Sequence, residues 1–307
     1  MTAAESWYAE RTYHHADFPA ERIAAERTDS VSVCLPARET AKTIGPILHT
    51  LMSLRDRGVV DQVVVVDAGS LDGTPDLAVS HGAEVYQEAA LLPGYGPALG
   101  KGDAMWRSLS VLSGDLVCFV DSDTEGFGEH FLCGLLGPLV CEVGVDYVKG
   151  FYRRPFRVDG FDLPDGGGRV TELTARPLLS RFYPELAGFR QPLAGEMAGR
   201  RELLERVPFS CGYAVETALL IDVYREAGLD AVAQVDLESR QNRHQPLGEL
   251  GPMAYAVLGA VTARLERDGR LAPTGGDPFV SFEGSALVAH EEGLVERPPM
   301  ASLRAAT

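Results

Sequence analysis

The sequence has no long apolar run and no cluster of basic residues. No stretch of about 18 apolar residues occurs, and the N-terminus lacks a basic segment followed by an apolar one, so neither a membrane span nor a signal peptide is expected. A formal net charge of -16 argues against nucleic acid or an anionic membrane as the main partner. We therefore expect a cytoplasmic protein in which any phosphate site is formed by a few basic residues against an acidic background.

Cysteine is also scarce, which excludes two further classes. The cysteines are odd in number and form no Cys-x-x-Cys pair; they are Cys34, Cys118, Cys133, Cys141 and Cys211. Neither a zinc site nor a disulfide framework is therefore expected. With 307 residues, of which 45% are hydrophobic, the chain is long enough to bury a large core.

What the chain does contain is an alternation of apolar strands and amphipathic helices. Residues 31–36 read as a buried strand that stops at a proline, and apolar positions recur at helical spacing over 42–54. Residues 63–66 are a continuous β-branched run, and a helix over 74–81 follows. This alternation predicts a mostly parallel sheet, with ligands in the crevice beyond the carboxyl ends of its strands.

The same pattern continues through the rest of the chain. We expect further strands over 84–86, 116–120, 145–152 and 231–235, and helices over 103–112, 129–140, 201–206, 217–224 and 251–265. The polar residues 1–30 contain a short amphipathic stretch over 20–27 and are expected to pack on the main body as an arm. His14 and His15 in this arm are either metal ligands or surface residues, and the second interpretation is favoured.

Two carboxylates follow one of the expected strands. Asp121 and Asp123, separated by Ser122, come directly after the apolar residues 116–120. A parallel strand would carry them to the same sheet edge as Pro36-Ala37 and Asp67, and hard carboxylate oxygens suit a divalent cation that holds phosphate. An isolated Asp-x-Asp is more often an acidic turn, but the convergence of polar residues at one edge favours a metal site.

Two glycine-rich segments each place a basic side chain at the expected start of a helix. Gly100-Lys101-Gly102 misses both the Walker A spacing and the dinucleotide fingerprint, which leaves a loop that brings Lys101 to a helix N-terminus, or an ordinary turn. Three glycines at 166–168 precede Arg169 and Thr171, a pattern that suits a phosphate or carboxylate, or a plain N-terminal turn with an exposed arginine. Glu216 opens another helix, where the helix dipole favours a carboxylate, so a structural role is open.

Together these motifs resemble GT-A glycosyltransferases, and specifically the glucosyl-3-phosphoglycerate synthases of actinobacteria. The resemblance runs from about residue 31 to 265 and returns at 295–300; its most specific pieces are residues 100–102 with 106–109, 121–123, 151–155 and 166–177. It implies an α/β GT-A fold, with a mostly parallel Rossmann-like sheet flanked by helices and a C-terminal helical acceptor region. The implied division is an N-terminal arm (1–30), a nucleotide-sugar-binding subdomain (31–152), an acceptor-binding subdomain (153–270) and a C-terminal tail (271–307).

The resemblance also implies an activity. It is the retaining transfer of a hexosyl group, with glucosyl the first choice, from UDP-glucose or GDP-glucose to 3-phosphoglycerate, with Mg²⁺ or Mn²⁺ and in a homodimer. A front-face substitution, in which the leaving phosphate helps to deprotonate the acceptor hydroxyl, is the implied mechanism. The alternatives are a transferase of specialised metabolism with another donor or phosphorylated acceptor, and a sugar-nucleotide-binding homologue with impaired catalysis.

Individual roles follow from the same resemblance. The nucleotide sugar would contact Pro36, Ala37, Glu39, Asp67, Ala68, Lys101, Asp121 and Ser122. The acceptor would contact Gly168, Arg169, Val170, Thr171 and His244. The catalytic group would comprise Glu216, Asp123 and Lys101, and the metal would be held by Asp123 with Asn242 or His244.

The chain departs from the family pattern on the donor side. Residues 36–41 read Pro-Ala-Arg-Glu-Thr-Ala where the family has Pro-Ala-x-Asn-Glu-Glu, and Ala68 stands where a serine is usual near the base. Asn242 falls where the family has a metal-binding histidine, with His244 two positions further on. Because an amide oxygen suits Mg²⁺ better than Mn²⁺, this change bears on the choice of metal.

Overall fold

The computed structural model describes the whole chain except residues 1, 155, 159–160, 164–166, 241–245, 276–277, 284, 291–293 and 305–307. Its helices are α1 (Ala3–Glu10), α2 (Ala20–Glu26), α3 (Ile44–Asp56), α4 (Thr74–Ser80), α5 (Lys101–Ser108), α6 (Glu129–Cys141), α7 (Arg176–Phe182), α8 (Arg201–Arg206), α9 (Val215–Ala227), α10 (Leu247–Arg267) and α11 (Met300–Arg304). Its strands are β1 (Thr12–His14), β2 (Val31–Ala37), β3 (Gln62–Asp67), β4 (Glu84–Gln87), β5 (Leu116–Phe119), β6 (Tyr147–Arg153), β7 (Phe156–Val158), β8 (Phe161–Leu163), β9 (Met197–Arg200), β10 (Phe209–Ser210), β11 (Val232–Ser239), β12 (Phe279–Glu283), β13 (Ala286–His290) and β14 (Glu296–Arg297).

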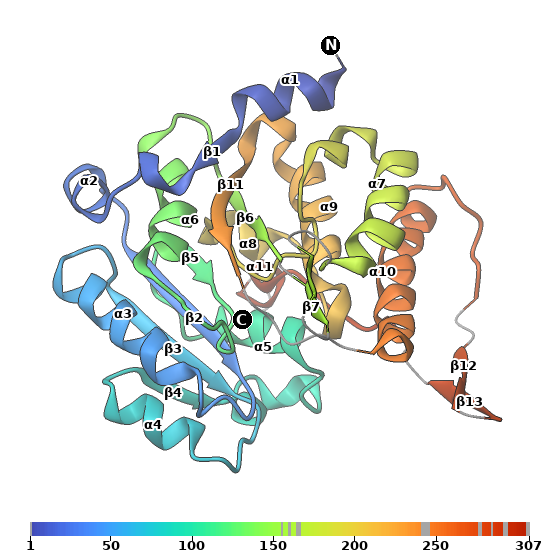
Figure 1. Ribbon diagram of the computed structural model, residues 1–307, viewed down its shortest axis with the longest axis horizontal. Coiled ribbons are helices and arrows are strands. Elements are labelled where there is room, and N and C mark those ends of the chain that lie inside the picture. Colours follow the sequence, from blue (N-terminus) through green and yellow to red (C-terminus); the bar gives the residue numbers. More distant parts are fainter. Residues whose placement is uncertain are drawn as a thin grey trace.

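An eight-stranded sheet forms the centre of the molecule, in the order β1-β11-β6-β9-β5-β2-β3-β4 (Figure 1). All neighbouring pairs are parallel except those of β9, which runs antiparallel to both β5 and β6. One face packs against α2, α3 and α6, and the other against α5, α8 and α9. Side chains of β2 alternate between the two cores: Val33 and Leu35 lie in one and Cys34 in the other. The predicted α/β fold with a mostly parallel sheet is confirmed.

Two strands of the central sheet, β1 and β9, were not among the predicted elements. Residues 197–200 are buried as β9 between β5 and β6, although Met-Ala-Gly-Arg shows no strand pattern. Residues 12–14 form β1 at the sheet edge, parallel to β11. The predicted packing of the N-terminal arm on the main body is therefore confirmed, and strand pairing is part of the reason.

Several strands end together at one edge of the sheet. Ala37 at the end of β2 lies opposite Asp67 at the end of β3, and Asp67 lies opposite Gln87 at the end of β4. The turn after β5 is fixed to the same edge, because the Ser122 hydroxyl donates to the Pro36 carbonyl at 2.8 Å. The residues that follow four strands therefore meet where the fold predicts a ligand crevice.

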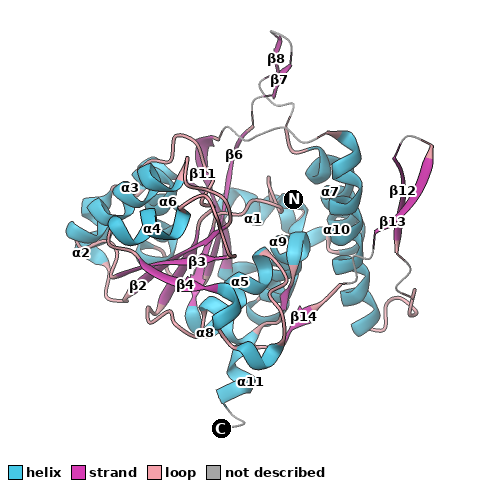
Figure 2. Ribbon diagram, turned by 90° about the horizontal axis from the view of Figure 1, so that it is seen from below, coloured by secondary structure: helices cyan, strands magenta, loops and turns pink. Residues whose placement is uncertain are grey.

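The C-terminal part of the chain returns to the centre of the molecule. Strand β14 pairs with β10 next to α5, while the β12–β13 hairpin stands beside α10 (Figure 2). A π-helix over Thr171–Ala175 leads into α7, which lies along α10. In the part of the chain that the structure describes, no helix is long and apolar enough to span a membrane.

Candidate active site

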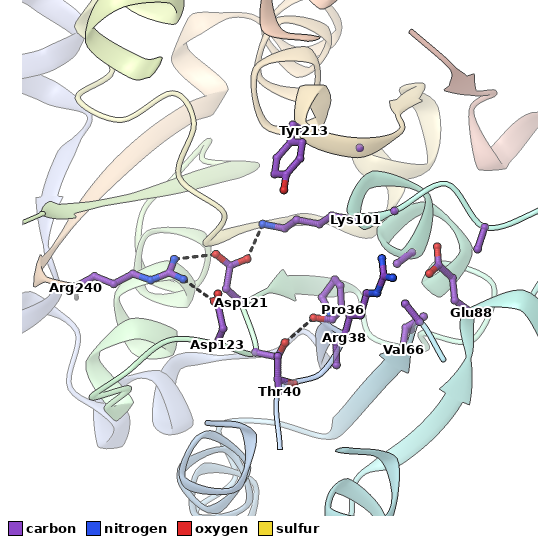
Figure 3. A pocket seen from close by; sticks show the side chains of 17 residues that line it. Pro36, Arg38, Thr40, Val66, Glu88, Lys101, Asp121, Asp123, Tyr213 and Arg240 are labelled. Atoms are coloured by element: carbon purple, nitrogen blue, oxygen red, sulfur yellow. Dashed lines mark hydrogen bonds and ion pairs between the residues drawn. The ribbon is translucent and has the colours of Figure 1, made fainter. Parts of the chain in front are cut away.

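A pocket of about 660 Å³ opens at the carboxyl edge of the sheet (Figure 3). Its walls come from the ends of β2 and β3, the residue after β4, the start of α5, the turn after β5, the turn before α9 and the residue after β11. The lining residues are Pro36, Ala37, Arg38, Thr40, Val66, Ala68, Glu88, Ala98, Gly100, Lys101, Ala104, Asp121, Ser122, Asp123, Gly212, Tyr213 and Arg240. The predicted convergence of Pro36-Ala37, Lys101 and the two aspartates is present.

Asp121 lies between two cations. Its Oδ1 accepts a hydrogen bond from Lys101 Nζ at 2.5 Å, and its Oδ2 accepts one from Arg240 Nη1 at 2.8 Å. Burial alone would raise the pKa of Asp121, but Lys101 and Arg240 hold it well below its usual range. Asp121 is therefore a permanently ionised anchor whose oxygens are both committed to protein donors.

Asp123 is placed differently from Asp121. Its side chain is 68% exposed and lines the pocket, and Arg240 Nη2 donates to its Oδ1 at 3.0 Å. An accessible carboxylate beside a pocket is the donor type that a hard divalent cation prefers, so this residue fits a metal ligand. The other two expected ligands, Asn242 and His244, lie outside the described residues.

Arg240 organises the aspartate pair, although the sequence assigned it no role. Its side chain is 2% exposed, and besides both aspartates it donates to Glu196 Oε1 at 2.5 Å and to the Tyr152 hydroxyl at 3.0 Å. Glu196 is fully buried and accepts from the Tyr152 hydroxyl at 2.8 Å through its other oxygen. The only sequence signal for Arg240 was its position two residues before Asn242, because a buried charge network leaves no periodic pattern.

Lys101 connects Asp121, in the turn after β5, to Glu216 at the start of α9. Its Nζ also donates to Glu216 Oε1 at 2.9 Å, which brings two of the predicted catalytic residues into contact. Burial opposes the charged form, but Asp121 and Glu216 raise the pKa of Lys101 well above its ordinary value. Glu216 does not line the pocket; it is buried in the first turn of α9 and holds the lysine.

The ion pair of Lys101 and Asp121 lies directly against the backbone of Gly195, which leaves no room for a side chain there. A Cβ at this position would lie 2.4 Å from Lys101 Nζ and 2.5 Å from Asp121 Oδ2. The neighbouring segment is fixed by Lys149 of β6, which donates to the Ala194 carbonyl at 2.7 Å. Burial lowers the pKa of Lys149 to about 8.

The residues at and after the ends of β2 and β3 that were predicted to contact the nucleotide sugar divide into two groups. Pro36, Ala37 and Ala68 line the pocket, whereas Asp67 and Glu39 lie beside it and hold its loops. Asp67 Oδ2 accepts from the amides of Gly69 and Ser70, and Glu39 Oε1 accepts from the Leu71 amide at 2.8 Å. Asp67 and Glu39 therefore each hold a loop beside the cavity through one carboxylate oxygen, and Asp67 Oδ1 is buried without a hydrogen-bond partner among the described residues.

Glu88 and Arg38 also line the pocket, and neither received a role from the sequence. Glu88 follows β4 and is 2% exposed, and Arg38 follows β2 and is exposed. Figure 3 shows Glu88 at the side of the view opposite Asp123, and Arg38 between the two. The sequence signal for Glu88 is its place directly after a strand, since ligands gather beyond the carboxyl ends of parallel strands.

The predicted acceptor residues Gly168, Arg169, Val170 and Thr171 lie at the start of the helical segment before α7. Val170 packs against α10 and Thr171 is buried, and Gly168 has a φ of 76°, which suits glycine. They do not line the pocket, and His244 lies outside the described residues.

A chain of contacts nevertheless connects the Gly168–Thr171 loop to the aspartates. The Gly167 amide donates to the Arg154 carbonyl at 3.1 Å, and Arg154 Nη2 donates to the Tyr152 hydroxyl at 2.9 Å, which contacts Arg240 in turn.

His14 and His15 take a surface position, as favoured from the sequence. His15 Nε2 lies 2.9 Å from Glu238 Oε1, and one ligand atom of each histidine and of Glu238 lie within 4.8 Å of one another. None of the three lines the pocket.

Comparisons with known proteins give a consistent result. Residues 32–167 match the model of glycosyl transferase family 2. Over 304 residues the chain is 43% identical to the glucosyl-3-phosphoglycerate synthase of Mycolicibacterium smegmatis, covering 97% of this chain and 98% of that one.

Solved structures show the same likeness. The crystal structure of mannosyl-3-phosphoglycerate synthase from Rubrobacter xylanophilus is 47% identical with a TM-score of 0.91, over 97% of this chain and 99% of that one. Glucosyl-3-phosphoglycerate synthase from Mycobacterium tuberculosis, in complex with Mn²⁺, UDP-glucose and phosphoglyceric acid, is 41% identical with a TM-score of 0.85, over 96% of this chain and 99% of that one.

Proposed function

This chain belongs to the family of glucosyl-3-phosphoglycerate synthases, and we propose that it transfers a glucosyl group from UDP-glucose to 3-phosphoglycerate. The observation that carries this proposal is the pocket at the sheet edge, where Asp123, Lys101 and Arg240 meet around one cavity. Two cations and an accessible carboxylate at this point suit a diphosphate with a divalent metal. The relative from M. tuberculosis binds Mn²⁺, UDP-glucose and phosphoglyceric acid together.

Asp123 is the described residue that would hold the divalent cation, and Asn242 or His244 would complete its site. When bound, the cation neutralises charge on the leaving nucleotide diphosphate. Arg240 touches both aspartates, so it sets the position of the Asp123 carboxylate before a metal arrives. A hard amide oxygen at position 242 leads us to expect that Mg²⁺ supports the reaction as well as Mn²⁺.

The residues of the pocket support a front-face transfer. The bond between the anomeric carbon and the β-phosphate oxygen breaks, the acceptor hydroxyl oxygen forms the new bond on the same face, and its proton passes to the leaving phosphate. Lys101 would face the developing negative charge, and Glu216 and Asp121 keep this lysine protonated and in place. Glu216 then acts as a positioning residue close to the reacting sugar.

Arg169, with Gly168, Val170 and Thr171, is our candidate for the acceptor site. Its guanidinium would fix the anionic groups of 3-phosphoglycerate, and the loop connects to the donor pocket through Arg154 and Tyr152. This keeps the expected division into a donor portion (31–152) and an acceptor portion (153–270), although β9 and β11 of the latter complete the central sheet. A cytoplasmic location and a homodimer also belong to the proposal.

A panel of nucleotide sugars tests the activity. UDP-glucose, GDP-glucose and GDP-mannose are each incubated with Mg²⁺ or Mn²⁺, with and without 3-phosphoglycerate, and nucleotide release is measured. We expect release from UDP-glucose that depends on the acceptor. No acceptor-dependent release from any donor would reject the proposal and leave the two alternatives, a transferase with another donor or phosphorylated acceptor and a sugar-nucleotide-binding homologue.

The Arg169→Ala variant tests the acceptor site. It should raise KM for 3-phosphoglycerate at least about tenfold while KM for the donor stays within twofold, because it removes a charged contact made to the acceptor alone. Equal effects on both substrates would contradict the assignment.

Mannosyl transfer to 3-phosphoglycerate is the second candidate function. The relative from Rubrobacter xylanophilus is a mannosyl-3-phosphoglycerate synthase and matches this chain at 47% identity. Release from GDP-mannose that exceeds release from UDP-glucose in the panel above would favour it.

A further inference from the structure

We propose that Glu88 selects the nucleobase of the donor by accepting a hydrogen bond from the ring N–H that uracil and guanine share. The inference rests on the proposed function, because it assumes that a nucleotide occupies the pocket. It assigns to Glu88 a role that neither the motifs nor the family resemblance provides.

The position and burial of Glu88 carry the inference. Its side chain lines the pocket from the residue after β4, and it is 2% exposed. Its Oε1 is buried and has no hydrogen-bond partner within the described part of the chain. A buried carboxylate oxygen without a partner is costly, so its presence at a pocket wall indicates a ligand that donates to it.

The charged residues around Glu88 affect its pKa, but none of them donates a hydrogen bond to its Oε1. Asp103 of α5 lies behind it, paired with Arg107 at 3.1 Å and with Arg297 at 2.7 Å, so these cations are already committed. Burial, with the charge of Asp103 next in importance, raises the pKa of Glu88 to about 7, and Arg107, Arg297 and Arg38 counteract this. Of these cations, Arg38 is the one that also lines the pocket.

The edges of the nucleobases explain the selectivity. Uracil presents N3–H and guanine presents N1–H, and guanine adds an amino group beside it, so a carboxylate can accept one bond from uracil and two from guanine. Cytosine and adenine present a ring nitrogen lone pair at this position, which repels a carboxylate, with one amino donor beside it. A buried acceptor should therefore reject cytosine and adenine strongly, since they leave it partly unpaired.

Calorimetric titration of the full chain with UDP, GDP, CDP and ADP in the presence of Mn²⁺ tests the inference, at pH 8 so that the carboxyl of Glu88 is ionised and can only accept. The wild type should bind UDP or GDP at least about 10-fold more tightly than CDP and ADP, the loss expected for one hydrogen bond to a charged group. Glu88→Ala should abolish this preference. Glu88→Gln should narrow it, because its amide can still accept from an imide N–H and can also donate to the ring nitrogen of cytosine or adenine.

The matched control is Glu84→Gln, because Glu84 is an exposed carboxylate of β4, the strand before Glu88, which accepts from Gln62 and Tyr86 and does not line the pocket. It should keep the wild-type preference. The comparison of UDP with GDP identifies which of the two bases the pocket prefers, and circular dichroism of each variant confirms folding.

The outcomes separate this inference from the proposed function. An unchanged preference in both Glu88→Ala and Glu88→Gln, or wild-type binding that does not discriminate among the four nucleotides, would overturn the role of Glu88 even if transfer from UDP-glucose is observed. The expected pattern without acceptor-dependent transfer would instead reject the proposed function and keep the base selection.

Discussion

At the scale of single residues, the two aspartates of the Asp-x-Asp motif have different tasks. Asp121 neutralises Lys101 and Arg240, whereas Asp123 offers an exposed carboxylate to the pocket. The expectation that Asp123 ligates the metal stays a prediction, and the structure supplies its physical basis. The two substitutions below separate an anchoring role from a ligating one.

Asp121→Asn should lower the free energy of unfolding by about 3 kcal/mol, because it leaves two cations short of a buried counter-charge. Asp123→Asn should change it by less than about 0.5 kcal/mol, since that side chain is exposed, but should weaken Mn²⁺ binding at least tenfold. Urea unfolding without metal and Mn²⁺ titration followed by electron paramagnetic resonance provide the two measurements. Equal losses of stability would contradict the division of roles.

Glu88 should make stability depend on pH. Its pKa is about 7 against an ordinary value of 4.5, so the folded chain binds a proton between these pH values that the unfolded chain has released. Its contribution to stability therefore falls as pH rises from 4.5 to 7, by up to about 3 kcal/mol. Glu88→Gln should raise Tm above that of the wild type at pH 8 and much less at pH 5, as measured by calorimetry without nucleotide. A gap that shrinks from pH 5 to pH 8 would contradict this sign.

At the scale of elements, the sequence predicted those whose hydrophobic period is clear. The strands over 31–36 and 63–66 were found because each is an apolar run that is buried on both faces, and the helix over 42–54 because its apolar residues recur at helical spacing. Strand β9 was not found, because Met197–Arg200 is short and is defined by its two neighbours rather than by its own pattern.

The sequence likewise predicted some residues of the candidate site and missed others. Lys101, Asp121 and Asp123 were accessible through motifs. Arg240 and Glu196 were not, because a buried ion pair is a property of tertiary contact.

In the Gly100-Lys101-Gly102 motif, Gly102 lets the first turn of α5 pack closely against Ser210 and Val215. A Cβ at Gly102 would lie 1.9 Å from the Ser210 carbonyl oxygen and 2.9 Å from Val215 Cβ. Gly102→Ala should therefore lower the free energy of unfolding by about 1–3 kcal/mol and weaken UDP binding, because the helix that carries Lys101 must move. Urea unfolding and calorimetric titration measure the two effects.

Gly94 supplies the matched control for this element. It lies in the loop before α5, has no positive φ, and a Cβ there would meet no atom of the described residues within 4 Å. Gly94→Ala should change stability by less than about 0.5 kcal/mol and leave UDP binding intact. If Gly102→Ala were equally well tolerated, the close approach of α5 to Ser210 would not constrain the site.

At the scale of the whole molecule, strand β14 near the C-terminus holds the loop before α5, which forms part of the pocket wall. Arg297 of β14 donates to Asp103 of α5 and to the carbonyls of Tyr95 and Pro97, and the Trp106 indole donates to the Pro298 carbonyl at 2.7 Å. The loop that these contacts fix contributes Ala98 and Gly100 to the pocket. Strand β14 therefore connects the stability of the chain to the shape of the pocket.

Arg297→Ala tests this connection, because it leaves Asp103 buried with one cation fewer and releases two loop carbonyls. The free energy of unfolding should fall by about 3 kcal/mol, and UDP should bind at least about fivefold more weakly. Arg206→Ala is the control, since that arginine pairs with Glu202 and Glu226 on the surface and should contribute less than about 1 kcal/mol. A destabilised Arg297→Ala variant with unchanged UDP affinity would show that β14 supports the fold without setting the position of the loop.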